Sequence, residues 1–149
     1  MSLDIDLTKV NYTFLRKPLL IGGKAMEYYE LRKAGKDIDF VISTEDYEEL
    51  KEKYPDPECH RDLFGDLGTM VEEFEIWKCI CLFDYEFLSE NAIEKEGYLI
   101  ISLEKLLFLK ALAMKEEKYH KDLELIVKKI FKIQYDTKLD EKYKKDLKM

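Results

Sequence analysis

The chain has few residues of the kinds that break or crosslink a fold. Its 149 residues include only three prolines, six glycines and two histidines, and its three cysteines are an odd number. Three cysteines cannot all pair, so they do not form a disulfide framework, and such a small number is typical of proteins in a reducing cytosol. We therefore expect a cytoplasmic protein that is stabilised by its hydrophobic core.

Basic charge and long apolar runs are also scarce. Lys and Arg number 25 against 32 Asp and Glu, which gives a formal net charge of -7. Because nucleic-acid backbones are bound by basic surfaces, this balance argues against general nucleic-acid binding. No apolar run approaches the roughly 20 residues that span a bilayer, and no signal peptide is visible, so we expect no membrane partner.

The apolar content is sufficient for one core. Hydrophobic residues make up 46% of the chain and aromatic residues 13%. At this length the composition predicts a single domain over residues 1–149, with little room for a second one. We expect its compact part at about 18–131, followed by a charged tail at 134–149 that frays or packs loosely.

The most informative stretch covers residues 19–43, LLIGGKAMEYYELRKAGKDIDFVIS. Its apolar start, Leu19–Ile21, is interrupted by Gly22–Gly23, which is how a buried strand ends in a tight loop. Residues 24–34 then have the apolar spacing and the good helix formers of an amphipathic helix. Gly35 stands where a left-handed residue closes such a helix. The stretch therefore predicts a strand, a glycine turn and a helix.

The strand predicted next, residues 37–42, opens with two carboxylates on one face. Side chains at i and i+2 of a strand point the same way, so Asp37 and Asp39 project together. Two such carboxylates raise each other's pKa unless a cation lies between them, and Mg²⁺ prefers these hard oxygen ligands combined with substrate phosphates. The amides of Gly22–Gly23 and the helix start offer a site for phosphate oxygens. Together these features predict phosphoryl or nucleotidyl transfer.

The order of apolar strand, Gly22–Gly23, helix and Asp37-x-Asp39 resembles the DNA polymerase β-like nucleotidyltransferase superfamily. It is most similar to small bacterial and archaeal members of the abortive-infection and antibiotic-modifying type. The resemblance implies an α+β nucleotidyltransferase fold, with a mixed β-sheet flanked by helices and further helices at the C-terminus. It also implies that the glycine pair binds the triphosphate and that Asp37 and Asp39 are catalytic metal ligands.

The activity implied is Mg²⁺-dependent transfer of a nucleoside monophosphate from a nucleoside triphosphate, with ATP the expected one. The acceptor is a hydroxyl of a small molecule, a protein or a tRNA end, and nothing in the sequence chooses among them. Lys24 after the glycine pair, and Arg32 at the position of an arginine that the family often carries, are implied to contact the phosphates.

The family's third metal carboxylate lies on a later strand, for which this chain has two candidates. Glu75 lies within a β-forming run, and Asp84 lies near the exit of the same region into the next helix. We prefer Glu75 for that reason and keep Asp84 as the alternative. A third carboxylate completes the site as a metal ligand or as the base for the attacking hydroxyl.

Two later helices also resemble the family. Ser102 caps an apolar helix at 103–114, and its Lys110 either snorkels to water or has a buried acidic or phosphate partner. The last helix, predicted at 117–133, carries Lys121–Asp122 near its start. This pair either positions the nucleotide or is an ordinary surface pair.

The remaining patterns predict scaffold. We expect a helix at 7–15, a helix at 44–54 with a Thr44 cap, a hairpin or bent strand at 69–82 and a strand at 98–101. The cysteines and a histidine pose a zinc alternative, but their spacing favours buried free thiols. These residues are Cys59, His60, Cys79 and Cys81.

A second hypothesis from another class fits the same residues. The chain keeps the fold but not the chemistry, as a nucleotide-binding or protein-interaction module such as one partner of a toxin–antitoxin pair. Ala34 and Gly35 stand where the family often has a Ser or Thr hydroxyl, which supports this hypothesis. The two hypotheses differ in whether a third carboxylate approaches the aspartate pair in space.

Overall fold

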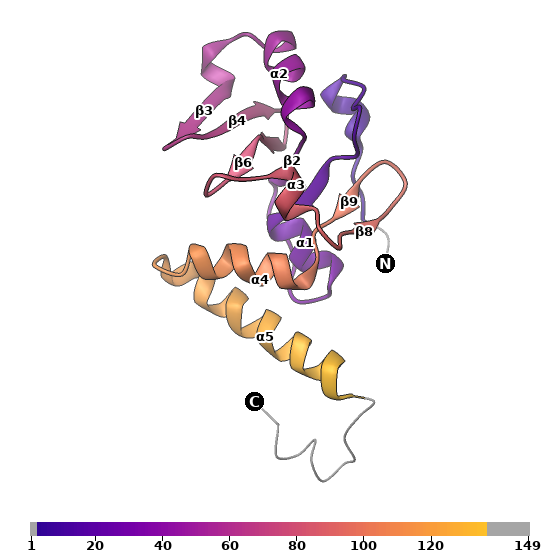
Figure 1. Cartoon of the computed structure of the whole chain (residues 1–149), viewed down its shortest axis with the longest axis vertical. Coiled ribbons are helices and arrows are strands. Elements are labelled where there is room, and N and C mark those ends of the chain that lie inside the picture. The colour runs from indigo at the N-terminus through magenta and orange to yellow at the C-terminus, as the bar shows by residue number, and fades with distance from the viewer. Residues whose placement is uncertain (1–2, 137–149) are drawn as a thin grey trace.

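A computed structural model describes residues 3–136, which form an α+β fold (Figure 1). The strands are β1 Leu19–Ile21, β2 Ile38–Val41, β3 His60–Leu63, β4 Asp66–Val71, β5 Phe74–Trp77, β6 Cys79–Ile80, β7 Phe83–Asp84, β8 Ile93–Glu94 and β9 Leu99–Ile100. The α-helices are α1 Gly22–Tyr28, α2 Thr44–Lys53, α3 Tyr85–Leu88, α4 Leu103–Leu112 and α5 His120–Tyr135. Three short 3-10 turns are η1 Leu7–Val10, η2 Pro57–Cys59 and η3 Glu117–Tyr119.

The main sheet is mixed and has seven strands in the order β3-β4-β5-β2-β1-β9-β8, while β6 and β7 form a separate ribbon. The central strand β2 is antiparallel to β1 and parallel to β5. Because of these directions, the C-terminal end of β1 lies at the same end of the sheet as the N-terminal ends of β2 and β5. The glycine pair and the predicted carboxylates are therefore brought together at one end of the central strands.

The central strands are apolar on both faces, so the sheet separates two cores. Leu20 and Phe40 pack in the core with residues of η1 and α2. Leu19 and Val41 pack in the other core, with residues of α1, α3, α4 and α5. The change of core from one residue to the next is the two-residue period of a strand. Figure 1 shows α2 at one end of the molecule and α4 and α5 at the other, with the strands between them.

Helix α1 is shorter than predicted and ends by a different device. It starts at Gly22 and ends at Tyr28, not at residue 34. Glu30 adopts a left-handed conformation with φ 60°, and its amide and that of Leu31 bond back to the carbonyls of Glu27 and Met26. This is the Schellman closure, with a glutamate in the position where glycine is usual. The prediction that Gly35 closes the helix is wrong.

The starts of two later helices follow the sequence closely. Ser102 Oγ accepts the Lys105 amide at 3.1 Å and caps α4, as predicted. Helix α2 is capped by Ser43, whose Oγ accepts the Asp46 amide at 3.2 Å, so the predicted cap Thr44 is one residue late.

The segment at 7–15 is not the predicted helix, because only η1 forms. The chain after it is held by a buried carboxylate instead. Asp46 of α2 accepts the amides of Leu15 and Arg16 at 2.9 and 3.0 Å, and the Tyr12 hydroxyl at 2.9 Å. Backbone groups that a helix would pair internally are therefore satisfied from α2.

The region at 60–84 is built of short antiparallel strands. The predicted hairpin is present: β4 and β5 pair and are joined at Glu72–Glu73. A further hairpin, β3 with β4, precedes it. The predicted strand at 98–101 is present as β9 and is paired with β1 and β8.

The last helix, α5, extends two residues beyond the predicted end. Residues 134 and 135 of the predicted tail therefore belong to it, and residues 137–149 lie outside the described part. No helix within residues 3–136 has the length and apolar character needed to cross a membrane. The three cysteines are free; Cys79 is buried, but Cys59 is half-buried and Cys81 is exposed, so the buried-thiol prediction is right for Cys79 alone.

Candidate active site

Three carboxylates lie near one another at the end of the central strands described above. Asp39 on β2 and Glu75 on β5 are Cα partners in a parallel pair, so their side chains project from the same face on neighbouring strands. Asp37 lies two residues before Asp39, just outside β2, and is close enough to Glu75 to raise the pKa of that carboxyl. Of the two predicted candidates for a third carboxylate, the structure brings Glu75 to the aspartate pair.

Asp84 has a different position. It is exposed, and its Oδ1 accepts the Phe87 amide at 3.0 Å, which makes it the N-cap of α3. A carboxylate in this place satisfies the free amides of a helix start.

The cluster of Asp37, Asp39 and Glu75 is electrostatically strained. Burial raises the pKa of Asp39 to about 6, and the charge of Asp37 adds to this while Lys110 opposes it. Burial raises the pKa of Glu75 to about 7, reinforced by the charge of Asp39 and by the hydrogen bond and charge of Asp37; Arg61 opposes it. Negative charge is thus in excess at this edge, and a proton or a cation relieves it.

The backbone of Gly22 lies directly against this cluster. Gly22 has φ +66°, and a Cβ at this position would collide with Oδ2 of Asp39. Glycine is therefore required here twice, for its left-handed conformation and for the close approach of the carboxylate. The next residue, Gly23, is less constrained, since a Cβ there would make ordinary contacts with Ala34 and Arg32.

The first turn of α1 leaves backbone amides next to the carboxylates. The first amides of a helix have no partner within the helix. Ile21, at the N-cap position, gives no side-chain hydrogen bond to them. Because α1 has only seven residues, any affinity for anions rests on these amides and on nearby cations.

Two of the predicted cations share one buried carboxylate. Arg32 donates from Nε and Nη2 to the two oxygens of Asp122 at 2.7 and 2.9 Å, and Lys110 Nζ lies 3.0 Å from Oδ2. Asp122 and Lys110 are both buried, and Lys110 Nζ also lies 4.6 Å from the centre of the Tyr119 ring. Lys110 therefore has a buried acidic partner, and the snorkelling alternative is wrong.

These ion pairs join the loop after α1, which carries Arg32, to α4 and α5 at the side of the carboxylate cluster. Burial opposes ionisation of Asp122, but hydrogen bonds from Arg32 and Lys110 outweigh it and keep its pKa below the usual value. Two cations against one carboxylate leave a net positive charge, and Lys110 is close enough to lower the pKa of Asp39. An excess of positive charge therefore lies beside an excess of negative charge.

The other predicted cations are placed differently. Lys24 Nζ lies 3.7 Å from Glu27 on the same helix, close to the glycine pair. Lys121 has 69% of its side chain exposed and is 3.9 Å from Glu124. The Lys121–Asp122 pair is therefore divided: Asp122 points into the molecule and Lys121 lies on the surface.

The donor set of the cluster is suited to Mg²⁺. Carboxylate oxygens are its usual protein ligands, and one or two of them commonly hold it together with water and substrate phosphates. Within residues 3–136, no group of three or more Asp, Glu, His or Cys side chains is placed so that it could hold a metal ion by itself. A magnesium ion at the cluster would thus take part of its ligands from substrate.

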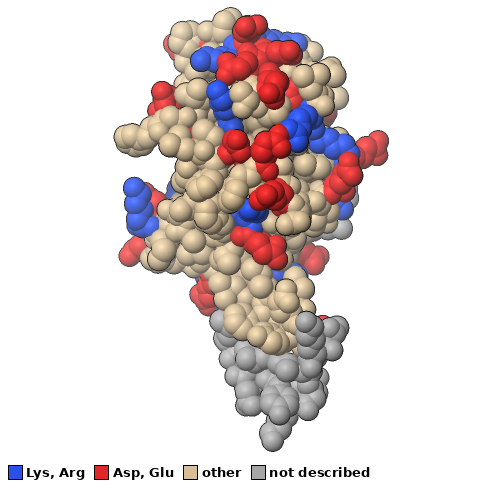
Figure 2. Space-filling view, in the orientation of Figure 1, with Lys and Arg blue, Asp and Glu red and all other residues tan. Residues whose placement is uncertain are grey.

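Sequence reasoning did not identify Arg61 as a site residue. It lies on β3 and lowers the pKa of Glu75, although the two residues are separated by a hairpin in the sequence. Only the register of three strands places them together, and no local pattern reports it. Beyond this site, Figure 2 shows acidic and basic side chains interspersed over one face of the described chain, without a continuous basic patch.

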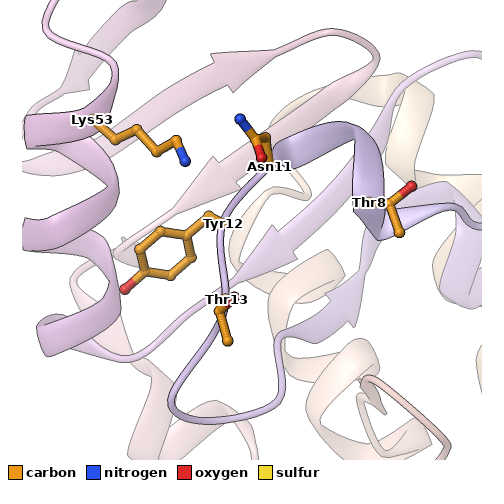
Figure 3. A pocket seen from close by; sticks show the side chains of 5 residues that line it. All are labelled: Thr8, Asn11, Tyr12, Thr13 and Lys53. Carbon is orange, nitrogen blue, oxygen red and sulfur yellow. The ribbon is translucent and has the colours of Figure 1, made fainter.

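A pocket of about 370 Å³ lies on the other face of the sheet, between the N-terminal segment and α2 (Figure 3). It is lined by Thr8, Asn11, Tyr12, Thr13 and Lys53. It contains one cation and no carboxylate, so it does not extend the cluster.

No protein-family model and no curated protein matches this sequence.

Proposed function

We propose that this chain is a Mg²⁺-dependent nucleotidyltransferase of the nucleotidyltransferase fold, which moves a nucleoside monophosphate from a triphosphate, with ATP the expected one, to a hydroxyl. The pairing of Asp39 with Glu75 on neighbouring parallel strands carries the proposal. Without a bound cation the fold gains nothing from these two half-buried carboxylates, because like charges that face each other on neighbouring strands destabilise a sheet. A function that brings positive charge to them explains their position.

In the proposed complex, Asp37 and Asp39 would hold the metal ion, with Glu75 either as a third ligand or as the base for the attacking hydroxyl, and the ion would neutralise charge on the reacting phosphates. The amides of Gly22–Gly23 bind oxygens of the triphosphate, because they are uncapped and adjoin Asp39. Lys24 on α1 and the cation pair of Arg32 and Lys110 provide positive charge on the same side.

Glu75 is the group suited to accept the proton of the acceptor hydroxyl. A base with a pKa near the operating pH is the most effective, and in the metal-free site burial and the charges of Asp39 and Asp37 raise the pKa of Glu75 to about 7. As the proton moves to Glu75, the hydroxyl oxygen forms a bond to the α-phosphorus and the bond from that phosphorus to the bridging oxygen breaks. Pyrophosphate then leaves with the electron pair of that bond.

A transfer assay tests the proposal. Each α-labelled nucleoside triphosphate is incubated with Mg²⁺ and with small-molecule, protein and tRNA acceptors, and pyrophosphate release and label transfer are measured. We expect turnover that falls by at least about 100-fold in Asp39→Asn, while circular dichroism shows an unchanged fold. Full turnover in this variant would contradict the assignment.

A nucleotide-binding module without turnover is the second candidate. It is favoured by Asp122, which already neutralises part of the charge of Arg32 and Lys110 before a phosphate arrives. Its signature is Mg²⁺-dependent nucleotide binding with no pyrophosphate release for any acceptor class. The same assay, combined with a binding measurement, therefore separates the two functions.

A further inference from the structure

Arg61 lies on the flank of the carboxylate cluster that faces away from the glycine pair. Across the sheet, β3 and β4 are on one side of the two carboxylate strands β5 and β2, and β1 with Gly22 is on the other. Arg61 is the Cα partner of Gly68, which in turn is the partner of Trp77 on β5. Residues paired in this way share a face, and Trp77 shares its face with Glu75 two residues earlier. Arg61 and the carboxylates therefore project from the same side.

The surface between Arg61 and the cluster has a defined shape. Gly68 has no side chain, and the Trp77 indole lies over it: a Cβ at Gly68 would come within 2.6 Å of Trp77 Cε3. Met70, the register partner of Glu75, is half-buried next to it. An exposed guanidinium, an indole and a methionine thus border the carboxylates on this flank, within electrostatic reach of Glu75.

Arg61 is the cation of the site that is free to bind a ligand. Arg32 and Lys110 are both paired with Asp122, and Lys24 is paired with Glu27. In the described part of the chain, Arg61 has no carboxylate within ion-pair distance. Its planar fork of donors matches a phosphate or a carboxylate.

We propose that Arg61 binds an anionic group of the acceptor, so that the acceptor is a hydroxyl compound that also carries a phosphate or a carboxylate. The inference rests on the proposed function. In an in-line displacement the attacking and leaving oxygens are on opposite sides of the phosphorus. With the leaving pyrophosphate at Gly22–Gly23, the attacking hydroxyl approaches over β4 and β3, where Arg61 lies.

Binding of a second anion tests this inference. The protein is first saturated with Mg²⁺ and a non-hydrolysable ATP analogue, and labelled inorganic phosphate is then titrated by equilibrium dialysis. Trp77, the only tryptophan of the chain, reports binding on this flank by its fluorescence. We expect saturable phosphate binding that weakens at least about tenfold in Arg61→Gln, roughly the loss of one charge-assisted contact. Arg16→Gln, which removes an exposed arginine paired with Glu86 elsewhere, serves as the matched control and should bind normally.

The outcomes separate the inference from the proposed function. Competition by acetate indicates a carboxylate-bearing acceptor, and its absence indicates a phosphate-bearing one. If the nucleotide analogue binds but phosphate binding is missing, or persists in Arg61→Gln, the role of Arg61 is overturned while the proposed function stands. If Arg61→Gln weakens the nucleotide analogue itself, Arg61 contacts the triphosphate and the acceptor assignment is wrong. Failure of the wild-type protein to bind the analogue with Mg²⁺ overturns both.

Discussion

Asp39 and Glu75 face each other across two parallel strands, β2 and β5, and each raises the energy of the other in its charged form. Both strands are central in the sheet, so the backbone pairing fixes the positions from which the two carboxylates project. The proton or cation that relieves this repulsion is thereby tied to the stability of the fold. The predictions below follow from this relationship and from its neighbours Gly22 and Asp122.

The stability of the protein should fall as pH rises from about 4 to about 7. The pKa values of Asp39 and Glu75 are raised to about 6 and about 7 in the folded state, above their unfolded values of about 4. Between these limits the folded protein binds more protons than the unfolded chain, so the free energy of unfolding decreases with pH. Urea unfolding at several pH values measures this slope.

The matched variant for that experiment is the double replacement Asp39→Asn with Glu75→Gln. Neither amide ionises, so the variant should lose less stability than the wild type over the same pH range. Mg²⁺ should stabilise the wild-type protein near pH 7, because it binds the folded state alone, and should leave the variant unchanged. An identical pH slope in both proteins would show that this pair is not a site of proton binding.

Replacing Gly22 with alanine should damage both stability and the site. The new Cβ is forced into a left-handed conformation and collides with the carboxylate of Asp39. We expect a loss of about 1 to 3 kcal/mol in the free energy of unfolding, measured with urea, together with the loss of Mg²⁺-dependent nucleotide binding. Gly35→Ala is the control, since nothing lies within 4 Å of a Cβ there. Equal behaviour of the two variants would show that Gly22 is not packed on Asp39.

Asp122→Asn should destabilise the packing of α5 and α4. The substitution removes the charge that compensates buried Lys110 and the partly exposed Arg32. Breaking a buried ion pair costs several kcal/mol, and the exposure of Arg32 lowers this, so we expect about 2 to 4 kcal/mol from thermal or urea unfolding. The neighbouring Lys121→Gln, on the surface, should change stability by less than about 0.5 kcal/mol. A neutral result for Asp122→Asn would mean that the three charges are solvated in solution.

Local patterns predicted those elements whose signals are themselves local. The apolar run before Gly22 became β1, and Ser102 capped α4, because each of these signals acts within a few residues. The end of α1 was missed because Glu30 takes the left-handed position for which glycine is the usual signal. The end of a helix can be predicted from the sequence when the residue in the left-handed closing position is the usual glycine.

The candidate site was predictable in part for the same reason. Spacing alone predicts that Asp37 and Asp39 share a strand face, but β2 starts at Ile38, so only Asp39 lies in the strand and Asp37 is exposed just before it. The choice of Glu75 over Asp84, the burial of Asp122 against Lys110, and the approach of Arg61 depend on strand register and helix packing between distant segments. Periodicity contains no information about those relationships.

Isothermal titration of ATP, GTP, CTP and UTP, each with and without Mg²⁺, tests the central claim most directly. The wild-type protein should bind at least one triphosphate only when Mg²⁺ is present, and Asp39→Asn should lose that binding. Asp84→Asn, which keeps the cap of α3, should bind as the wild type does. Binding that is independent of Mg²⁺ and of Asp39, or no binding of any triphosphate, would contradict the assignment of this carboxylate cluster as a metal–nucleotide site.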